Sequence, residues 1–223
     1  MSRELIHLMS FLLVLVVAGT ASADQWEITI PDASFEDHVL AKSASLDIAD
    51  AGYTGAWKSH SGGAWIDYLY WAANGWPEDL PAHSGNNKAY ADLDIYQILD
   101  ETYIEGGTYT LKAWVGQPWA GYASGWRLYF TSEDHEDELI EASGTAGLSW
   151  EQVSLEYTAT AADAGKKIGI KMWCNEEVSF DDVTLSYDGP AGNLRATNPT
   201  PADGAVLGET WASLGWSAAY SAV

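Results

Sequence analysis

The sequence predicts an all-β protein built as an antiparallel β-sandwich. Apolar and polar residues alternate in several segments, and no long segment repeats with the 3.6-residue period of a helix. Clusters of glycine and acidic residues separate these segments at the spacing typical of sandwiches. The 223 residues are enough for one sandwich-sized domain and part of a second.

The expected strands follow from this alternation. In the segment TYTLKAWVG, Tyr109, Leu111, Ala113 and Val115 alternate with polar or aromatic partners. The remaining expected strands are AYADLDIYQIL (89–99), GWRLYFTSE (125–133), WEQVSLEYTA (150–159), KIGIKMWC (167–174) and VSFDDVTLSY (178–187). Residues 40–81 are less regular and predict long loops with short strands, and residues 131–141 predict a solvated loop that leads into a strand.

Both ends of the chain are expected to lie outside the main domain. Residues 1–23 have a positive start, a short apolar run and a small-residue end at Ala23, which predicts a signal peptide and an exported protein, secreted or at the cell surface. We expect a domain at 24–188 and a linker at 189–198. In 199–223, the motifs NPTPADGA and LGW resemble the opening of immunoglobulin- or fibronectin-like modules. This resemblance implies a truncated second β domain and further domains of the same polypeptide.

The charge and the cysteine count exclude some classes of protein. The formal net charge is −22, with 10 basic and 32 acidic residues. This charge opposes binding to nucleic acid or anionic lipid through a basic patch, but it suits divalent cations and neutral ligands. The single cysteine, Cys174, excludes an intramolecular disulfide framework. It alternates in step with Ile168, Ile170 and Met172, so we expect a buried thiol.

Asp181 raises a question of charge balance. In the strand expected at 178–187, side chains alternate between faces, so Asp181 should share a face with Val183, Leu185 and Tyr187. An unpaired carboxylate on an apolar face is costly. Asp182 should point the other way. Backbone amides or Lys88 are one means of neutralising Asp181, and a bound cation is another.

The aromatic content predicts a binding surface. The chain has twelve tryptophans and twelve tyrosines. Trp114 and Trp173 alternate away from the apolar positions of their strands, and Trp65, Trp71 and Trp119 lie in loop-like sequence. Aromatic rings stack on sugar rings, and pockets of aromatic walls with a few polar groups bind small molecules. We expect at least two of these tryptophans to line one surface. The alternative is a second hydrophobic layer under the long loops.

Short motifs in a fixed order carry a family resemblance. They are IPDASFEDHVL, NNKAYADLDIYQIL, GGTYTLKAWVG, GWRLYF and VSFDDVTLSY. Over residues 26–187 the chain resembles the bacterial carbohydrate-binding-module-like jelly rolls, which include galactose-binding-like domains. The resemblance implies a jelly roll with a structural Ca²⁺ between its first and last strands. Glu36 and Asp181 would be ligands, and Asp182, Asp37 and carbonyls near Asn86–Lys88 are weaker candidates.

The same motifs are similar to those of the calcium-dependent cyanobacterial cyclases that build indole alkaloids. That resemblance makes Tyr90 an aromatic residue of the site and places Ser179 where those enzymes have an acidic aspartate. A serine hydroxyl cannot easily act as that acid. The sequence has no nucleophile elbow, P-loop, dinucleotide fingerprint or zinc-protease motif, and its five histidines do not stand at zinc-ligand spacing.

We therefore expect an exported, calcium-stabilised jelly roll that binds carbohydrate or a similar neutral ligand without chemical turnover. The expected ligand-binding residues are Trp65, Trp71, Tyr90, Trp114, Trp119 and Trp173, and the expected metal-binding residues are Glu36, Asp181 and Asp182. Two other interpretations stay open. One is a structural or adhesive module with no small ligand, and the other is a cyclase- or lyase-like enzyme.

Overall fold

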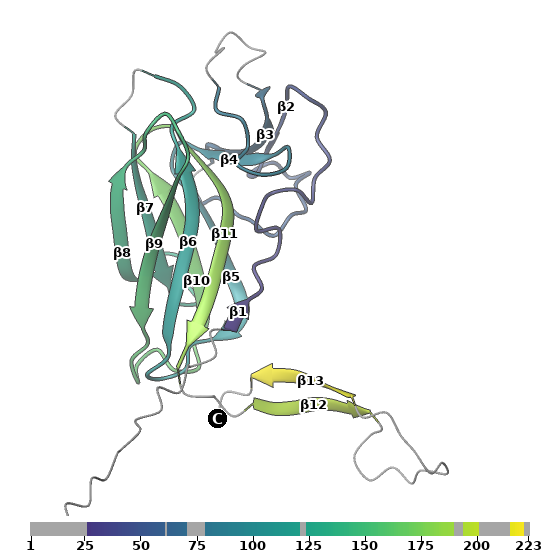
Figure 1. Cartoon of the computed structure of the whole chain (residues 1–223), viewed down its shortest axis with the longest axis vertical. Helices are drawn as coiled ribbons and strands as arrows, with labels where there is room; N and C mark the ends of the chain where they lie inside the picture. Colours follow the sequence, from purple (N-terminus) through teal and green to yellow (C-terminus); the bar gives the residue numbers. More distant parts are fainter. Residues whose placement is uncertain are drawn as a thin grey trace, which may run out of the picture.

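The protein is a jelly-roll β-sandwich, as the alternation predicts. The computed structural model describes residues 26–60, 62–70, 79–120, 124–189, 194–200 and 215–220, and all the elements named in these ranges are strands. Two antiparallel sheets pack face to face (Figure 1). In the described residues, no helix is long and apolar enough to cross a membrane.

One sheet has seven strands and the other has four. The larger sheet has the order β2-β3-β4-β11-β6-β9, with β1 paired to β11, and the smaller has the order β5-β10-β7-β8. The larger sheet consists of β1 (Trp26–Ile28), β2 (Ala44–Asp47), β3 (Ala64–Tyr68), β4 (Lys88–Ala91), β6 (Thr108–Gly116), β9 (Glu151–Thr158) and β11 (Val178–Asp188). The smaller sheet consists of β5 (Asp94–Thr102), β7 (Gly125–Thr131), β8 (Glu138–Thr145) and β10 (Lys167–Cys174). Because β1 pairs with β11, the first and last strands of the sandwich are neighbours, as expected.

The core lies between the sheets and follows the predicted alternation. Every second residue of β6, from Tyr109 to Val115, is buried in it, and so are Ile168, Ile170 and Met172 of β10. Cys174 is a free thiol and is fully buried, as predicted. It donates a hydrogen bond to the carbonyl of Ala91, and burial raises the pKa of its thiol above the usual range.

One segment expected to be a single strand is two strands in different sheets. The chain leaves the larger sheet after β4 at Ala91 and enters the smaller sheet with β5 at Asp94. Leu93, between them, is exposed although it fits the alternating pattern. Alternation alone does not reveal such a crossing, because both strands keep the same two-residue period.

The prediction that Asp181 shares a face with Val183 and Leu185 is wrong. The register between β11 and β6 shifts between Asp181 and Thr184, and Asp182 has a φ of +44°. This β-bulge adds one residue, so Phe180 and Val183 both enter the core. Asp181 therefore lies on the outer side of the sheet, away from the core, although it is fully buried.

Several expectations fall on the ends of the chain. Residues 194–200 and 215–220 form a separate two-stranded sheet, β12 (Leu194–Thr200) and β13 (Gly215–Tyr220), which pairs with no strand of the sandwich (Figure 1). The domain boundaries and the truncated second domain stay predictions. The signal peptide at 1–23 and Trp71 lie outside the described residues.

Candidate functional site on the larger sheet

Three predicted ligand residues lie together on the outer face of the larger sheet. Ala64 and Ile66 of β3 and Ala89 and Ala91 of β4 face the core, so the residues between them face outward. Trp65 pairs with Tyr90 across β3 and β4, and Tyr90 pairs with Ser179 across β4 and β11. The ring of Tyr90 lies 5.5 Å from that of Trp65 and 5.7 Å from that of Trp119, measured between centroids.

Polar groups lie beside these rings. The Tyr90 hydroxyl donates a hydrogen bond of 3.1 Å to Asp92 Oδ1. Ser179 Oγ and Glu177 Oε2 are buried and have no hydrogen-bond partner among the described residues. We call this group the aromatic site; it consists of Trp65, Tyr90, Asp92, Trp119, Glu177 and Ser179.

The surroundings of Glu177 and Tyr90 in the aromatic site favour the protonated, neutral forms of these two side chains. Burial raises the pKa of Glu177, and the nearby charge of Asp92 adds to this effect, although the neighbouring polar group of Tyr90 opposes it. Burial also raises the pKa of the Tyr90 hydroxyl above its usual range, so it stays protonated. A carboxyl with a raised pKa can donate a hydrogen bond or a proton closer to neutral pH than an ordinary one.

A buried ion-pair cluster lies in the next row of the same face. Lys88 Nζ lies 3.0 Å from Asp67 Oδ1 and 2.9 Å from Asp79 Oδ1, and all three side chains are almost completely buried. Asp67 and Lys88 are a cross-strand pair of β3 and β4. Lys88 therefore binds these two aspartates and is not the partner of Asp181 in this structure.

Backbone amides of residues 83, 84 and 182 hold the Asp181 carboxylate. Asp181 Oδ2 accepts hydrogen bonds from the backbone amides of His83 (2.8 Å) and Ser84 (3.2 Å), and Oδ1 accepts one from the amide of Asp182 (2.8 Å). The side chains of His83 and Ser84 contact the Asp182 carboxylate at 2.6 and 2.7 Å. Asp182 therefore binds the same loop as Asp181, so the expectation that it points the other way is wrong.

The same loop also holds Glu36. The backbone amides of Asn86 and Asn87 both donate to Glu36 Oε1 at 2.7 Å. Gly85, between the two halves of the loop, has a φ of +63°, and a Cβ there would lie 2.2 Å from Glu36 Oε1. A glycine is therefore needed where the loop passes the carboxylate. We call residues 83–87 the clamp loop, because it joins Glu36 to Asp181 and Asp182.

The clamp loop does not fully offset the burial of Asp181. The pKa of this carboxyl is raised to about 7: burial raises it most and the charge of Asp182 adds to this, while the amides of Ser84, Asp182 and His83 lower it. Amide hydrogen bonds favour the ionised form, whereas removal from water disfavours it. The backbone-amide explanation for Asp181 thus accounts for its position but leaves its charge costly near neutral pH.

The oxygens around Glu36 suit a calcium ion. Asp32 Oδ2 and Asn87 Oδ1 are buried beside Glu36 and have no hydrogen-bond partner among the described residues. Calcium binds carboxylate and amide oxygens in shells of six to eight. However, within the described residues the oxygens of Glu36, Asp181 and Asp182 do not form a set lying within 4.8 Å of one another. The donor chemistry therefore fits Ca²⁺ beside Glu36, where Asp32 and Asn87 supply the unpartnered oxygens.

The other predicted ligand residues lie apart from the aromatic site. Trp114 of β6 is on the larger sheet, where its ring stacks on His83 at 3.8 Å between centroids and 17° between planes. Trp173 of β10 is on the smaller sheet, with the guanidinium of Arg127 4.8 Å from its ring centroid. The structure thus brings Trp65, Tyr90 and Trp119 together, places Trp114 against His83 on the same sheet, and places Trp173 on the other sheet.

Glu177 is a site residue that sequence reasoning missed. It lies two residues before Ser179, and the two-residue period of a strand would have placed both on one face. The thirty-two acidic residues of the chain hid this signal, because no single carboxylate is distinguished by the sequence.

Comparison with known proteins places the sandwich in a family. The chain belongs to the HpiC1-like family (HpiC1 cyclase), whose model matches residues 26–186. No curated protein matches the sequence.

Solved structures share the fold at low sequence identity. A Stig cyclase, Fisc, from Fischerella sp. TAU is 16% identical with a TM-score of 0.55, covering 74% of this chain and 98% of that one. A Fischerella sp. TAU cyclase in complex with 4-(1H-indol-3-yl)butan-2-one is 18% identical with a TM-score of 0.51, covering 73% and 98%. The CBM22-1 xylan-binding domain of Paenibacillus barcinonensis Xyn10C is 11% identical with a TM-score of 0.46, covering 68% and 100%. The expected likeness to the cyclases is thus found.

Proposed function

We propose that the aromatic site binds a neutral ligand with ring-shaped apolar faces and hydroxyl groups, with carbohydrate as the first class to test. The observation that carries this proposal is that three contacting aromatic rings lie beside two buried polar atoms, Ser179 Oγ and Glu177 Oε2, that have no partner among the described residues. Buried polar atoms are nearly always paired in proteins, so unpaired ones mark places where a ligand or water supplies the partner.

The chemistry of the site matches such a ligand. The partly exposed ring of Trp65 offers apolar surface for the C–H face of a sugar ring, whereas the rings of Tyr90 and Trp119 beside it are buried. Ser179 can donate to or accept from a hydroxyl, and Glu177 can do the same when protonated. Since burial disfavours the charged form of Glu177, a neutral ligand is favoured over an anion.

We propose calcium as a structural cofactor that binds beside Glu36, next to the clamp loop. Glu36, with Asp32 and Asn87 beside it, would hold the ion, and its charge would also keep Asp181 ionised. A cation there would fix the clamp loop, which lies over the outer face of β11. The support is the oxygen donor set and the two unpartnered buried oxygens beside Glu36.

The test is a glycan array probed with the chain in excess calcium, with Trp65→Ala as the variant and Trp173→Ala as the matched control on the other sheet. The proposal predicts a defined set of glycans that bind the wild type and the control equally and bind Trp65→Ala more weakly. Absence of any glycan or neutral ring ligand would favour the structural or adhesive alternative. Binding that disappears only in Trp173→Ala would place the ligand on the smaller sheet and contradict the proposal.

A second candidate function is cyclisation of a bound substrate, favoured by membership of the HpiC1-like family. Ser179 replaces the expected acid, but Glu177 lies on the same face with a raised pKa, so it is the group suited to donate a proton. Incubation with 4-(1H-indol-3-yl)butan-2-one analogues and isoprenoid-bearing indoles tests this activity. Turnover by the wild type that is lost in Glu177→Gln, with ligand binding retained, would support it. Binding without product from any substrate would leave the binding function alone.

We further propose that the protein is exported and that the sandwich is one domain of a longer surface or secreted polypeptide. The support is the sequence pattern of residues 1–23 and 189–223. Expression in a bacterial host with detection of the amino-terminal residue tests the export. A mature protein that begins at Asp24 is the expected result, and a cytoplasmic protein that retains Met1 or Ser2 would contradict it.

A further inference from the structure

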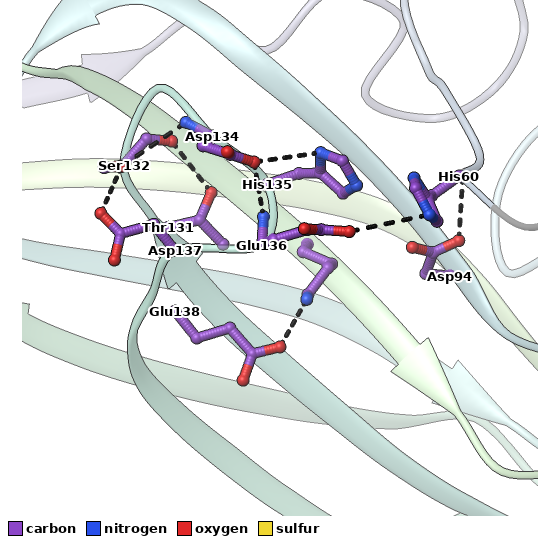
Figure 2. Close-up of polar contacts among 10 residues, drawn as sticks. His60, Asp94, Thr131, Ser132, Asp134, His135, Glu136, Asp137 and Glu138 are labelled. Atoms are coloured by element: carbon purple, nitrogen blue, oxygen red, sulfur yellow. Dashed lines mark hydrogen bonds and ion pairs between the residues drawn. The ribbon is translucent and has the colours of Figure 1, made fainter.

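Two histidines and a glutamate from distant parts of the sequence meet at one end of the smaller sheet. His60 lies between β2 and β3, whereas His135 and Glu136 lie in the loop between β7 and β8. One ligand atom from each of these three side chains lies within 4.8 Å of the other two. His60 Nε2 is 3.7 Å from Glu136 Oε1, and Figure 2 shows the two side chains pointing toward each other.

His135 is already held in the orientation of a metal ligand. Its ring stacks on Tyr96 of β5, with 4.2 Å between centroids and 11° between planes. Its Nδ1 faces Asp134 Oδ1 at 3.5 Å, and its Nε2 is buried with no hydrogen-bond partner among the described residues. A carboxylate beside one ring nitrogen commonly orients a histidine so that the other nitrogen binds a metal. Nε2 is therefore the available donor.

The backbones around the three residues are fixed by local hydrogen bonds. The amide of His60 donates to Asp94 Oδ1 at 3.1 Å, and the amide of Glu136 donates to Asp134 Oδ1 at 3.0 Å (Figure 2). The side chains of His60 and Glu136 are 56% and 67% exposed. Their ends can therefore move by the roughly 1 Å needed to reach bonds of ~2.0–2.2 Å to a common ion, while their Cα atoms stay in place.

We propose that His60, His135 and Glu136 form a binding site for a divalent transition-metal ion, with Zn²⁺ as the physiological occupant. Two imidazoles and one carboxylate suit Zn²⁺, whereas Ca²⁺ prefers shells made of oxygen alone. Three protein ligands leave one position of a tetrahedral ion open to water or to another ligand. This site is distinct from the proposed calcium site, which uses oxygens beside Glu36, and it does not depend on the proposed function.

The bound ion would join two loops that share no strand pairing. The segment that contains His60 is anchored to β5 through Asp94, and the β7–β8 loop is anchored by Ser132 and Asp137, whose side chains hydrogen-bond at 2.7 Å. Asp94 pairs with Trp173 in the register of β5 and β10, so the site lies at the rim of the outer face of the smaller sheet. A metal ion bound there would hold this rim in place. Its open coordination position would lie beside the outer face of the smaller sheet.

The test uses the full chain without a histidine tag, freed of metal with a chelator and kept in excess calcium chloride. Zinc chloride is titrated by calorimetry, and Co²⁺ is bound separately to record its visible absorption spectrum. The variants are His60→Gln and Glu136→Gln, and the matched control is Glu133→Gln, which removes one charge from an exposed residue of the same loop. Loss of a group that merely orients a ligand costs ~10–100-fold in affinity, so loss of a direct ligand should cost at least that.

The proposal predicts one Zn²⁺ per chain, insensitivity to calcium, and an affinity that falls about tenfold or more in His60→Gln and in Glu136→Gln but not in Glu133→Gln. The Co²⁺ spectrum should show the intense bands of a four-coordinate ion and lose them in the same two variants. No zinc binding by the wild type would overturn the proposal. So would an adventitious ion only, seen as binding of the same strength in all three variants.

Discussion

The outer faces of the two sheets both carry aromatic rings, but these rings have different neighbours. On the smaller sheet, Arg127 covers Trp173 and Lys171 Nζ lies 4.6 Å from the ring centroid of Tyr129. Lys171 and Arg127 also reach the carboxylates of β8, so each cation has an acidic partner. On the larger sheet, the rings of the aromatic site contact one another, beside buried polar atoms without partners.

This difference distinguishes an outer face whose contacts contribute to stability from an outer face that is suited to bind a ligand. A ring covered by a cation of its own sheet is already satisfied, and such contacts contribute to stability. A buried hydroxyl or carboxyl without a partner costs free energy, and natural proteins keep such costs mainly at functional sites. The aromatic site is therefore where we expect a ligand, whereas the cation-covered face of the smaller sheet is complete without one.

The largest expected effect comes from the buried charges beside the aromatic site. Lys88→Met would leave Asp67 and Asp79 buried without their cation, and breaking a buried ion pair costs about 3–5 kcal/mol. Lys167→Met is the matched control on the smaller sheet, because its partner Asp100 is 98% exposed. Urea denaturation should show a large loss of unfolding free energy for the first variant and under about 1 kcal/mol for the second. Equal losses would remove the contrast between the two faces.

Removal of calcium should give the next largest effect. Binding to the folded state alone stabilises it by about 2.7 kcal/mol at a hundredfold excess over Kd. Excess EDTA should therefore lower the Tm by several degrees, and calcium should restore it while magnesium does so poorly. Glu36→Gln and Asp181→Asn should weaken this response, whereas Asp188→Asn, an exposed control on the same strand, should keep it. A Tm indifferent to EDTA in every variant would remove the calcium proposal.

Asp181 should make the calcium-free protein sensitive to pH. Its folded pKa of about 7 lies above the ordinary value of 3.8, so between these values the folded state holds a proton that the unfolded chain has released. The stabilisation from this proton is fully present below pH 3.8 and is lost as the pH rises through 7. In EDTA, Tm should fall between pH 5.5 and 8, and Asp181→Asn should flatten this slope. A Tm that rises over this range in the wild type but not in Asp181→Asn would contradict the shift.

The smallest expected effect is on affinity at the aromatic site. Loss of one stacking ring should weaken binding of the selected ligand about tenfold, which is about 1.4 kcal/mol. Calorimetry should find this loss for Trp65→Ala, whereas Trp114→Ala, whose ring already stacks on His83, should change affinity much less. The reverse order would mean that the ligand displaces His83 and binds over β6.

The sequence was sufficient to predict the sandwich because alternation directly encodes which side chains of β6 and β10 enter the core. It was insufficient at Asp181, because an added residue in a β-bulge reverses the alternation without leaving any distinctive residue type. The cluster of His60, His135 and Glu136 was also missed. His60 lies 75 residues before His135, and His135 and Glu136 are consecutive residues of a loop, so the sequence contains no recognisable ligand spacing.

Hydrogen–deuterium exchange of the chain with and without its selected ligand, in excess calcium, tests the central claim most directly. It needs no substitution and reports on both sheets in one experiment. Binding at the aromatic site predicts slower exchange in residues 62–70, 88–92 and 176–180, with residues 125–131 and 167–174 unchanged. Slower exchange confined to residues 125–131 and 167–174 would place the ligand on the smaller sheet and contradict the account.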